Sequence, residues 1–420
     1  MSQATKKLAF STLCVTTLAL SPGQAADATP TAPAPAAASA AKSPFSYTLT
    51  GSVGYDSNVY LVNNGTLSRR ESTLGTAGAK ITAKLEPGIL LSYGATASRY
   101  WDETSQDNVK HVLGAGWTRK AGDLSGSANT EFAQVDGSAT TANYTGSGYV
   151  DKSGFATAAP RERGDQLQNK TDLSVRYDTR LGFVRGIGKL QYWDMQTKLV
   201  AGEKYVDRHD IQGGVDAGRA FAKGGPEYYL GYRNGYQFQD RDGGLGVDAS
   251  NHYDRYLAGV DGKILPFLKL AAQAGWSIHD YGSGYGGSDH REEGLYTDIT
   301  ATWNVTKTDE LQFKTSENRT VSSTGTNSVL GSTHQLNWKH TFNQEWNASL
   351  TGRLAKIDYA PASRIEVDYT AMASVTWNAT KAVSATLGIS QDWVENKIVT
   401  GGDSREYDRA FVSAGVTWKL

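Results

Sequence analysis

The feature that most restricts the fold is a two-residue alternation of apolar and polar side chains that recurs along the chain. In residues 169–178, for example, Leu173 and Val175 alternate with Asp172 and Arg176. The same alternation is found in 207–221, 268–278, 295–305 and 365–377. Because successive side chains of a β-strand point to opposite faces, this period predicts strands with one apolar and one polar face. The sequence therefore predicts an all-β fold.

The connections between these segments come in two lengths, and the two lengths alternate along the chain. Short, turn-like connections lie at 86–88, 120–123, 180–182, 223–226, 265–266, 306–309, 343–345 and 379–381. Longer connections rich in Gly, Asp, Ser and Asn lie at 61–70, 101–108, 136–165, 194–206, 240–251, 281–292, 322–331, 360–364 and 397–405. Short periplasmic turns and long extracellular loops alternate in this way in outer-membrane barrels. We therefore expect a closed antiparallel transmembrane β-barrel of about 18 strands, within a range of about 16 to 18.

Aromatic side chains gather at the expected strand ends, and the chain contains 22 Tyr and 10 Trp. Those expected near the short turns are Tyr93, Trp117, Phe221, Tyr228, Phe267, Trp303, Phe313, Phe342, Trp346, Trp377 and Trp418. Those expected near the long loops are Tyr55, Phe132, Tyr192, Tyr236, Phe238, Tyr256, Trp276, Trp393 and Phe411. Two such rings mark the two interfaces of a membrane-spanning barrel. The alternative is the aromatic core of a soluble β-sandwich.

The start of the chain has the parts of a secretory signal peptide. Two lysines supply positive charge, residues 8–20 form an apolar core, and small residues follow. We expect a signal peptide over 1–25, an Ala/Pro-rich periplasmic tether over 26–44 and the barrel over 45–420. The single cysteine, Cys14, lies in the leader, so the mature chain would have no disulfide and no cysteine-based metal site. Export to the outer membrane of a Gram-negative-type cell is the expected destination.

The polar faces of the expected strands carry many charges, and ions buried in a dry interior are costly. A water-filled lumen removes this conflict. We expect the pore to be lined by Lys170, Asp172, Arg176, Asp178, Arg208, Asp210, Arg233, Arg255, Lys269, Asp298, Lys314, Arg353 and Asp368. A mild basic excess would favour anions weakly, whereas paired charges would give little selectivity. Inward-facing Trp193, Tyr229, Tyr253 and Tyr296 are candidates for stacking on sugars.

The longest connection, 136–165, is the third outer loop by this count. In general porins that loop folds inward and narrows the pore. By analogy, one hypothesis assigns a loop constriction to Asp151, Arg161, Glu162, Arg163 and Asp165. The other hypothesis is an ordinary exposed loop.

No residue pattern in the sequence indicates catalysis, a metal site or a cofactor. The seven histidines form no HExxH motif, and no helix is expected after the Gly-rich run 282–287, which therefore does not resemble a phosphate cradle. His279 and His290 flank that run, where a polar loop is a simpler interpretation than a catalytic or metal site. The net charge of −1 gives no field that would attract nucleic acid. We therefore expect no enzymatic activity, no cofactor and no nucleic-acid partner.

Two segments resemble known outer-membrane proteins. The last residues, with Ser413, Gly415 and Trp418, resemble the C-terminal sorting signal of outer-membrane barrels, although Leu420 stands where Phe or Trp is usual. Residues 54–59, Gly-Tyr-Asp-Ser-Asn-Val, follow a low-complexity tether and resemble the putative β-barrel porin 2 family, some members of which accompany exopolysaccharide loci. That resemblance implies a barrel and a channel, but no particular substrate.

These observations favour an outer-membrane channel for the passive diffusion of small hydrophilic solutes. The alternatives are a barrel associated with exopolysaccharide export or binding, and a structural or adhesive barrel. The expected partners are outer-membrane lipid and lipopolysaccharide, the barrel assembly machinery through the C-terminal strand, and small hydrophilic solutes or saccharides. Assembly into a homo-oligomer is left open by the sequence.

Overall fold

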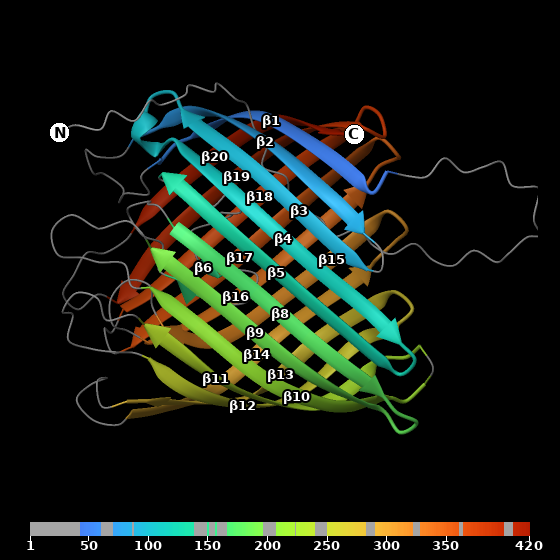
Figure 1. Cartoon of the computed structure of the whole chain (residues 1–420). Helices are drawn as coiled ribbons and strands as arrows, with labels where there is room; N and C mark the ends of the chain where they lie inside the picture. Colours follow the sequence, from blue (N-terminus) through green and yellow to red (C-terminus); the bar gives the residue numbers. More distant parts are fainter. Residues whose placement is uncertain are drawn as a thin grey trace, which may run out of the picture.

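The computed structural model describes residues 43–59, 70–85, 88–137, 149–150, 156–157, 166–195, 207–222, 224–239, 250–282, 290–321, 328–360, 364–398 and 406–420. The leader, most of the tether and most of the long connections lie outside these residues. Eighteen strands form one antiparallel sheet, which confirms the predicted fold class and strand number (Figure 1). Among the described residues, no helix has the length and apolar character needed to cross a membrane.

The wall strands are β1 (Phe45–Asp56), β2 (Ser72–Leu85), β3 (Ile89–Tyr100), β4 (Asn108–Ala121), β5 (Leu124–Gly137), β8 (Gln166–Asp178), β9 (Phe183–Met195), β10 (Arg208–Ala220), β11 (Glu227–Gln239), β12 (Asn251–Leu265), β13 (Leu268–Tyr281), β14 (His290–Asn304), β15 (Asp309–Val321), β16 (Ser328–Thr341), β17 (Trp346–Ala360), β18 (Arg364–Asn378), β19 (Val383–Ile398) and β20 (Tyr407–Lys419). A separate hairpin is formed by β6 (Tyr149–Val150) and β7 (Ala156–Thr157). The short 3-10 helix η1 (Thr104–Gln106) precedes β4.

The sheet closes on itself because β1 pairs with β2 on one side and with β20 on the other. The seam between β1 and β20 runs from Thr48↔Lys419 to Asp56↔Phe411. Closure pairs both β1 and β20 on two sides, so neither strand has an edge exposed to lipid, where an unpaired backbone group would be costly. We call the Leu420 end of the barrel the turn end and the Asp56 end of β1 the loop end. The turn end is on the right in Figure 1, where the C terminus is marked.

The short connections are local turns stabilised by side-chain oxygens. Between β8 and β9, Thr179 Oγ1 accepts hydrogen bonds from the backbone N–H groups of Leu181 (3.2 Å) and Gly182 (3.1 Å). Between β16 and β17, Asn343 Oδ1 accepts the N–H of Trp346 at 2.8 Å. In the turn before β3, Gly88 has φ 80°, a left-handed conformation that favours glycine. Such turn chemistry is readable in a sequence, which explains why the short connections were predicted correctly.

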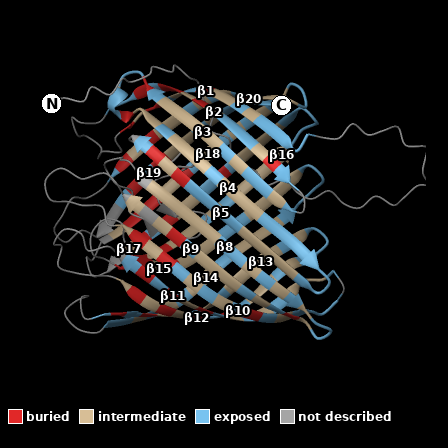
Figure 2. Cartoon of the chain, in the orientation of Figure 1, coloured by how far each residue is buried: buried red, intermediate tan, exposed pale blue. Residues whose placement is uncertain are grey.

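The outward face of the wall is apolar and the inward face is polar, as the alternation predicted. On β8, Leu173, Val175 and Tyr177 are all at least half exposed, as expected for side chains that face lipid. Large aromatic side chains are exposed on this face at both ends of the barrel, including Trp346, which stacks on Trp377 at the turn end with ring centroids 6.1 Å apart. Figure 2 shows the buried residues gathered toward the loop end.

One aromatic residue does not lie where the sequence analysis placed it. Phe411 was expected in the outer ring near the long loops, but Val412 and Val416 occupy the outward positions of β20 and are exposed. The two-residue period therefore turns Phe411 inward, where it packs against a buried cluster that contains Leu74 and Tyr100. The prediction was wrong because nearness to a loop was given more weight than the alternation of the strand.

Candidate functional site: the lumen and its loop end

All the side chains that the sequence assigned to the pore lie on the inward-facing positions of their strands, opposite the exposed apolar set. They differ in burial. Arg208, Asp210, Arg233, Arg255 and Asp368 are buried. Those of intermediate exposure are Lys170, Arg176, Asp178 and Arg353, and those that are exposed are Asp172, Lys269, Asp298 and Lys314. The buried members mostly lie nearer the loop end, so the lumen is more crowded there than at the turn end.

The inward charges of β8 to β11 form ion pairs along one side of the lumen. Arg176 donates two hydrogen bonds to the carboxylate of Glu227, at 2.7 and 2.8 Å, and one to Asp178 at 2.7 Å. Asp216 is fully buried between Arg185 at 2.7 Å and Arg233 at 2.6 Å. Forked arginine–carboxylate contacts are strong and directional. These charges therefore compensate one another across neighbouring strands.

Glycines on β10 to β12 make room for large side chains to lie flat against the wall. A Cβ atom at Gly259 would stand 2.1 Å from Cζ of Tyr229, and one at Gly235 would stand 2.5 Å from Cζ of Tyr253. At Gly214 a Cβ would stand 2.4 Å from Cδ of Arg233. Because no real side chain tolerates such distances, the glycines are a packing requirement of this wall. The sequence showed these glycines, but only the cross-strand register showed what covers them.

Nearer the loop end the polar side chains form a buried network. Tyr253 donates a hydrogen bond to Asp210 at 3.0 Å, and Gln237 donates one to the same carboxylate at 3.3 Å. His279 lies between Ser277 at 2.8 Å and Asn251 at 2.9 Å. Buried polar groups are tolerable when they are satisfied in this way. The network fills the lumen side of β10 to β13.

Pairing between β14 and β15 stops before the strands end. Toward the loop end the last pair is Thr297↔Glu317, although β14 pairs with β13 as far as His290 and β15 pairs with β16 as far as Val321. The freed segment, 318–321 of β15, and its partner segment 328–331 of β16, which also pairs with 357–360 of β17, are called the β15–β16 tip below. Backbone carbonyls of β15 in this tip contact strands four and five places further round the barrel. Arg208 of β10 donates to the carbonyl of Val321 at 3.2 Å, and Gln237 of β11 approaches that of Arg319 at 3.5 Å.

These contacts require the tip to fold into the lumen. β10 and β15 are five strands apart in the sheet, or about 24 Å along the wall at about 4.8 Å per strand, beyond the reach of an arginine side chain. Arg255 reaches Asn318 of the tip at 2.7 Å. On the other side of the tip, Glu292 of β14 accepts from Arg319 at 2.5 Å and from Ser328 at 3.0 Å. The tip is thus held across the mouth from both sides.

The predicted constriction and the observed one differ in origin. Asp151, Arg161, Glu162, Arg163 and Asp165 lie outside the described residues, so their place in the lumen stays a prediction. Of loop 136–165, the hairpin of β6 and β7 is described, and Cα atoms of β7 come within 8 Å of β15 and β16. The residues of the β15–β16 tip and their partner Glu292 were missed by sequence reasoning, because a strand that leaves the wall has the same alternation as one that stays in it.

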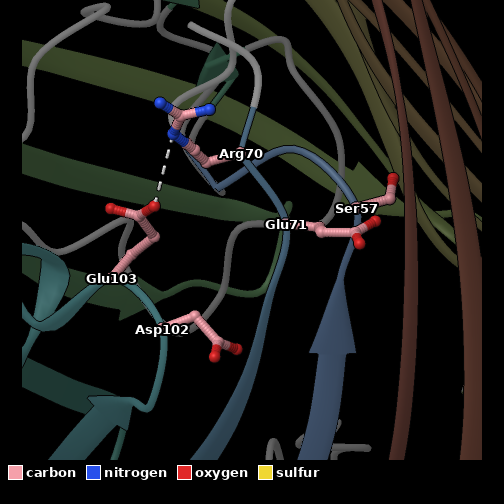
Figure 3. Close-up of a pocket in the computed structure, with 5 residues that line it drawn as sticks. All are labelled: Ser57, Arg70, Glu71, Asp102 and Glu103. Carbon is pink, nitrogen blue, oxygen red and sulfur yellow. Dashed lines mark ion pairs between the residues drawn. The ribbon is translucent and has the colours of Figure 1, made fainter.

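A pocket opens at the loop end beside β1 and β3, with a volume of about 650 Å³. Figure 3 shows its lining residues: Ser57, Arg70, Glu71, Asp102 and Glu103. Arg70 and Glu103 are 3.6 Å apart, and the Asp102 carboxylate accepts a hydrogen bond from Ser72 at 3.3 Å. Across the described part of the chain, no group of three or more His, Cys, Asp or Glu side chains is arranged to hold a metal ion.

Part of the chain matches a known protein family, and its fold has distant structural neighbours. Residues 255–420 match the family model described as Putative beta-barrel porin 2. A search of curated proteins gave no match. The siderophore receptor PirA from Pseudomonas aeruginosa is similar in structure, with a TM-score of 0.43, 8% identity, and coverage of 90% of this chain and 80% of that chain. The ferric-catecholate import receptor Fiu from E. coli K12 gives 0.40 and 9%, with 89% and 81% covered. No functional conclusion follows from likeness at this level.

The closed barrel and the family match both point to the outer membrane. The match does not include the 54–59 motif that first carried the resemblance, so the two observations come from different parts of the chain. Residues 255–420, in the second half of the barrel, match Putative beta-barrel porin 2, the family that the first strand resembles.

Proposed function

We propose that this protein is an outer-membrane channel for the passive diffusion of small hydrophilic solutes. The observation that carries the proposal is the polarity of the interior: charged and hydroxyl side chains line the inward face, and apolar side chains cover the outward face. A dry core would leave these ions at a high cost in free energy, whereas a wet lumen hydrates them. Passage of this kind needs no catalytic group.

The proposal includes a route to the membrane and a set of partners. A signal peptide directs the chain across the inner membrane, β20 presents the C-terminal signal to the barrel assembly machinery, and the mature barrel sits among outer-membrane lipid and lipopolysaccharide. The docked β15–β16 tip narrows the loop end of the channel, so it sets an upper limit on solute size.

Planar-bilayer recording of the purified full-length protein tests the proposal. A channel gives stepwise current increases that scale with salt concentration. The docked tip also favours a second candidate, a structural barrel whose mouth stays closed. Complete absence of current, from protein whose folded state is shown by heat-modifiable gel mobility, would support that second candidate and reject the channel.

A further inference from the structure

The lumen has two chemically different walls. On six adjoining strands the inward positions are Ser, Thr or Gly, with Lys80 as the one exception. These positions lie in 384–390 of β19, 413–417 of β20, 48–54 of β1, 76–82 of β2, 92–98 of β3 and 114–118 of β4. We call these positions the hydroxyl wall. The side of the lumen formed by β8 to β12, called the charged wall, carries the ion pairs and the flattened tyrosines. Alternation alone does not bring six such strands together; the closure of β1 on β20 does.

The hydroxyl wall is covered by small side chains. An added Cβ would meet its nearest atom at 3.4 Å at Gly388 and at 3.7 Å at Gly94, and at Gly114 it would lie 2.6 Å from the hydroxyl oxygen of Ser92. The close neighbour at Gly114 is therefore a small hydroxyl group, whereas the close neighbour at Gly259 is a tyrosine ring. Most of the Ser and Thr side chains on the hydroxyl wall are half-buried. Because Ser, Thr and Gly project less far from the backbone than Arg and Tyr, more room is left beside this wall than beside β8 to β12.

The hydroxyl groups keep hydrogen-bonding capacity toward the lumen. Thr50 donates to the carbonyl of Gly78 at 3.3 Å, and the hydroxyls of Ser52 and Thr76 are 3.3 Å apart. Each hydroxyl has one donor and two acceptor sites, so a hydroxyl that donates to the wall is also able to accept a bond from a solute. A solute that moves along this wall meets uncharged donors and acceptors at intervals set by the strands, about 4.8 Å apart.

A cation that moves along the same path meets no carboxylate within the hydroxyl wall, and an anion meets one cation there, Lys80. On the charged wall, Arg176 is neutralised by Glu227 and Asp178, and Asp216 is shared by two arginines. Those charges therefore exert a weaker field than free charges would. An uncharged molecule with many hydroxyls exchanges its hydration for equivalent bonds to the wall, since hydroxyl–hydroxyl and hydroxyl–water bonds are similar in strength.

We propose that solutes pass along the hydroxyl wall and that the channel favours uncharged polyhydroxylated molecules, the chemical class of free sugars and polyols, over ions of the same size. This inference rests on the proposed channel function and names the solute class that the channel takes. Lys80 is the one cation within the residue ranges that define the hydroxyl wall, and Lys84 and Lys120 occupy inward positions of the same strands at the turn end.

Solute entry into liposomes that contain the purified protein tests the inference. Glucose, glucuronate and glucosamine have the same ring and differ in charge, and glucose is expected to enter several-fold faster than either ion. Entry of no solute would reject the channel itself. Equal rates, or faster entry of an ion, would leave the channel standing and overturn the solute class.

Single cysteines locate the path, because Cys14 is the only natural cysteine. In a Cys14→Ser background, Thr96→Cys places a thiol at mid-height on the hydroxyl wall, and Asp298→Cys places one at mid-height on β14, nine strands round the barrel and therefore across the lumen. A bulky uncharged thiol reagent is expected to reduce glucose entry several-fold for Thr96→Cys and much less for Asp298→Cys, each compared with the same variant before reagent. The reverse order would overturn the proposed path.

Discussion

The side chains of the charged wall stay flat because specific inward positions have no Cβ atom. Tyr229 lies over Gly259, and Gly218 is also close to it, since an added Cβ there would stand 2.6 Å from Cβ of Tyr229. The ring thus lies along the wall of β11 and β12 and does not project across the lumen. At the scale of a residue, the width of the lumen depends on which inward positions have no side chain.

Gly259→Leu is expected to push Tyr229 off the wall and into the lumen. Overpacking of this kind costs about 1–3 kcal/mol of folding free energy, and a displaced ring lowers conductance. Urea unfolding in detergent and single-channel recording measure the two effects. Gly213→Leu is the matched control, because Gly213 faces outward and an added Cβ meets no atom within 4 Å. Equal conductance for the two variants would contradict the role given to Gly259.

Asp216 is the second residue whose removal has a defined consequence. Asp216→Asn leaves Arg185 and Arg233 without their shared carboxylate, so we expect a loss of about 2–4 kcal/mol in stability and a shift of the reversal potential toward anion selectivity. Asp172→Asn is the control, since Asp172 is exposed: it should change selectivity but alter stability by less than about 0.5 kcal/mol. A variant at Asp216 as stable as the control would show that the pairing is not structural.

At the scale of an element, the loop end of β15 has exchanged one set of partners for another. It stops pairing with β14 after Glu317, and side chains from β10, β11 and β12 then bond to the tip. The backbone groups that leave the ladder are therefore partly satisfied by side chains, as buried backbone groups require. On the β14 side, the described part of 318–321 has side-chain contacts in place of a strand ladder: the ion pair of Arg319 with Glu292 and the packing of Val321 against Tyr281. On that side this segment is therefore less strongly held than a strand with a ladder on both sides.

Release of the tip is expected to widen the channel. The double variant Arg208→Ala, Arg319→Ala removes a contact to Val321 and the ion pair to Glu292, so single-channel conductance should rise. The control is Arg291→Ala, because Arg291 pairs with Glu293 on the outward face and does not touch the tip. Unchanged or smaller conductance in the double variant would mean that the tip is not the narrowest part of the channel.

At the scale of the whole molecule, closure between β1 and β20 decides whether a barrel exists. The seam includes a pair of backbone hydrogen bonds between Tyr47 and Leu420, at 3.1 and 2.9 Å, which reach the last residue of the chain. Because every strand depends on its neighbours around the ring, loss of one edge strand exposes two unpaired edges to lipid.

Deletion of 407–420 is therefore expected to abolish the folded barrel. The intact protein should migrate differently on a detergent gel before and after boiling, and the truncated protein should migrate identically under both conditions. Deletion of 27–42, within the tether, is the control and should keep the difference. A truncated chain that still shows heat-modifiable mobility would contradict the closure described here.

The sequence alone determined the fold class, the strand number, the short turns and the inward set of side chains. These follow from local rules: a strand alternates every two residues, and a turn is specified by the residues within it. Lys170, Asp172 and Arg176 could be assigned to the inner face for that reason. The same rules, applied more strictly, would also have placed Phe411 inward.

Only the tertiary structure decided which strands face one another and where a strand leaves the wall. The contact of Arg208 with Val321 joins residues more than a hundred positions apart, and the hydroxyl wall forms only when β20 meets β1. Both depend on the register summed over many strand pairs and on the curvature of a closed sheet, which no local pattern encodes. The narrow mouth and the two chemically different sides of the lumen therefore follow from closure of the sheet, whereas the barrel itself follows from the repeated two-residue alternation.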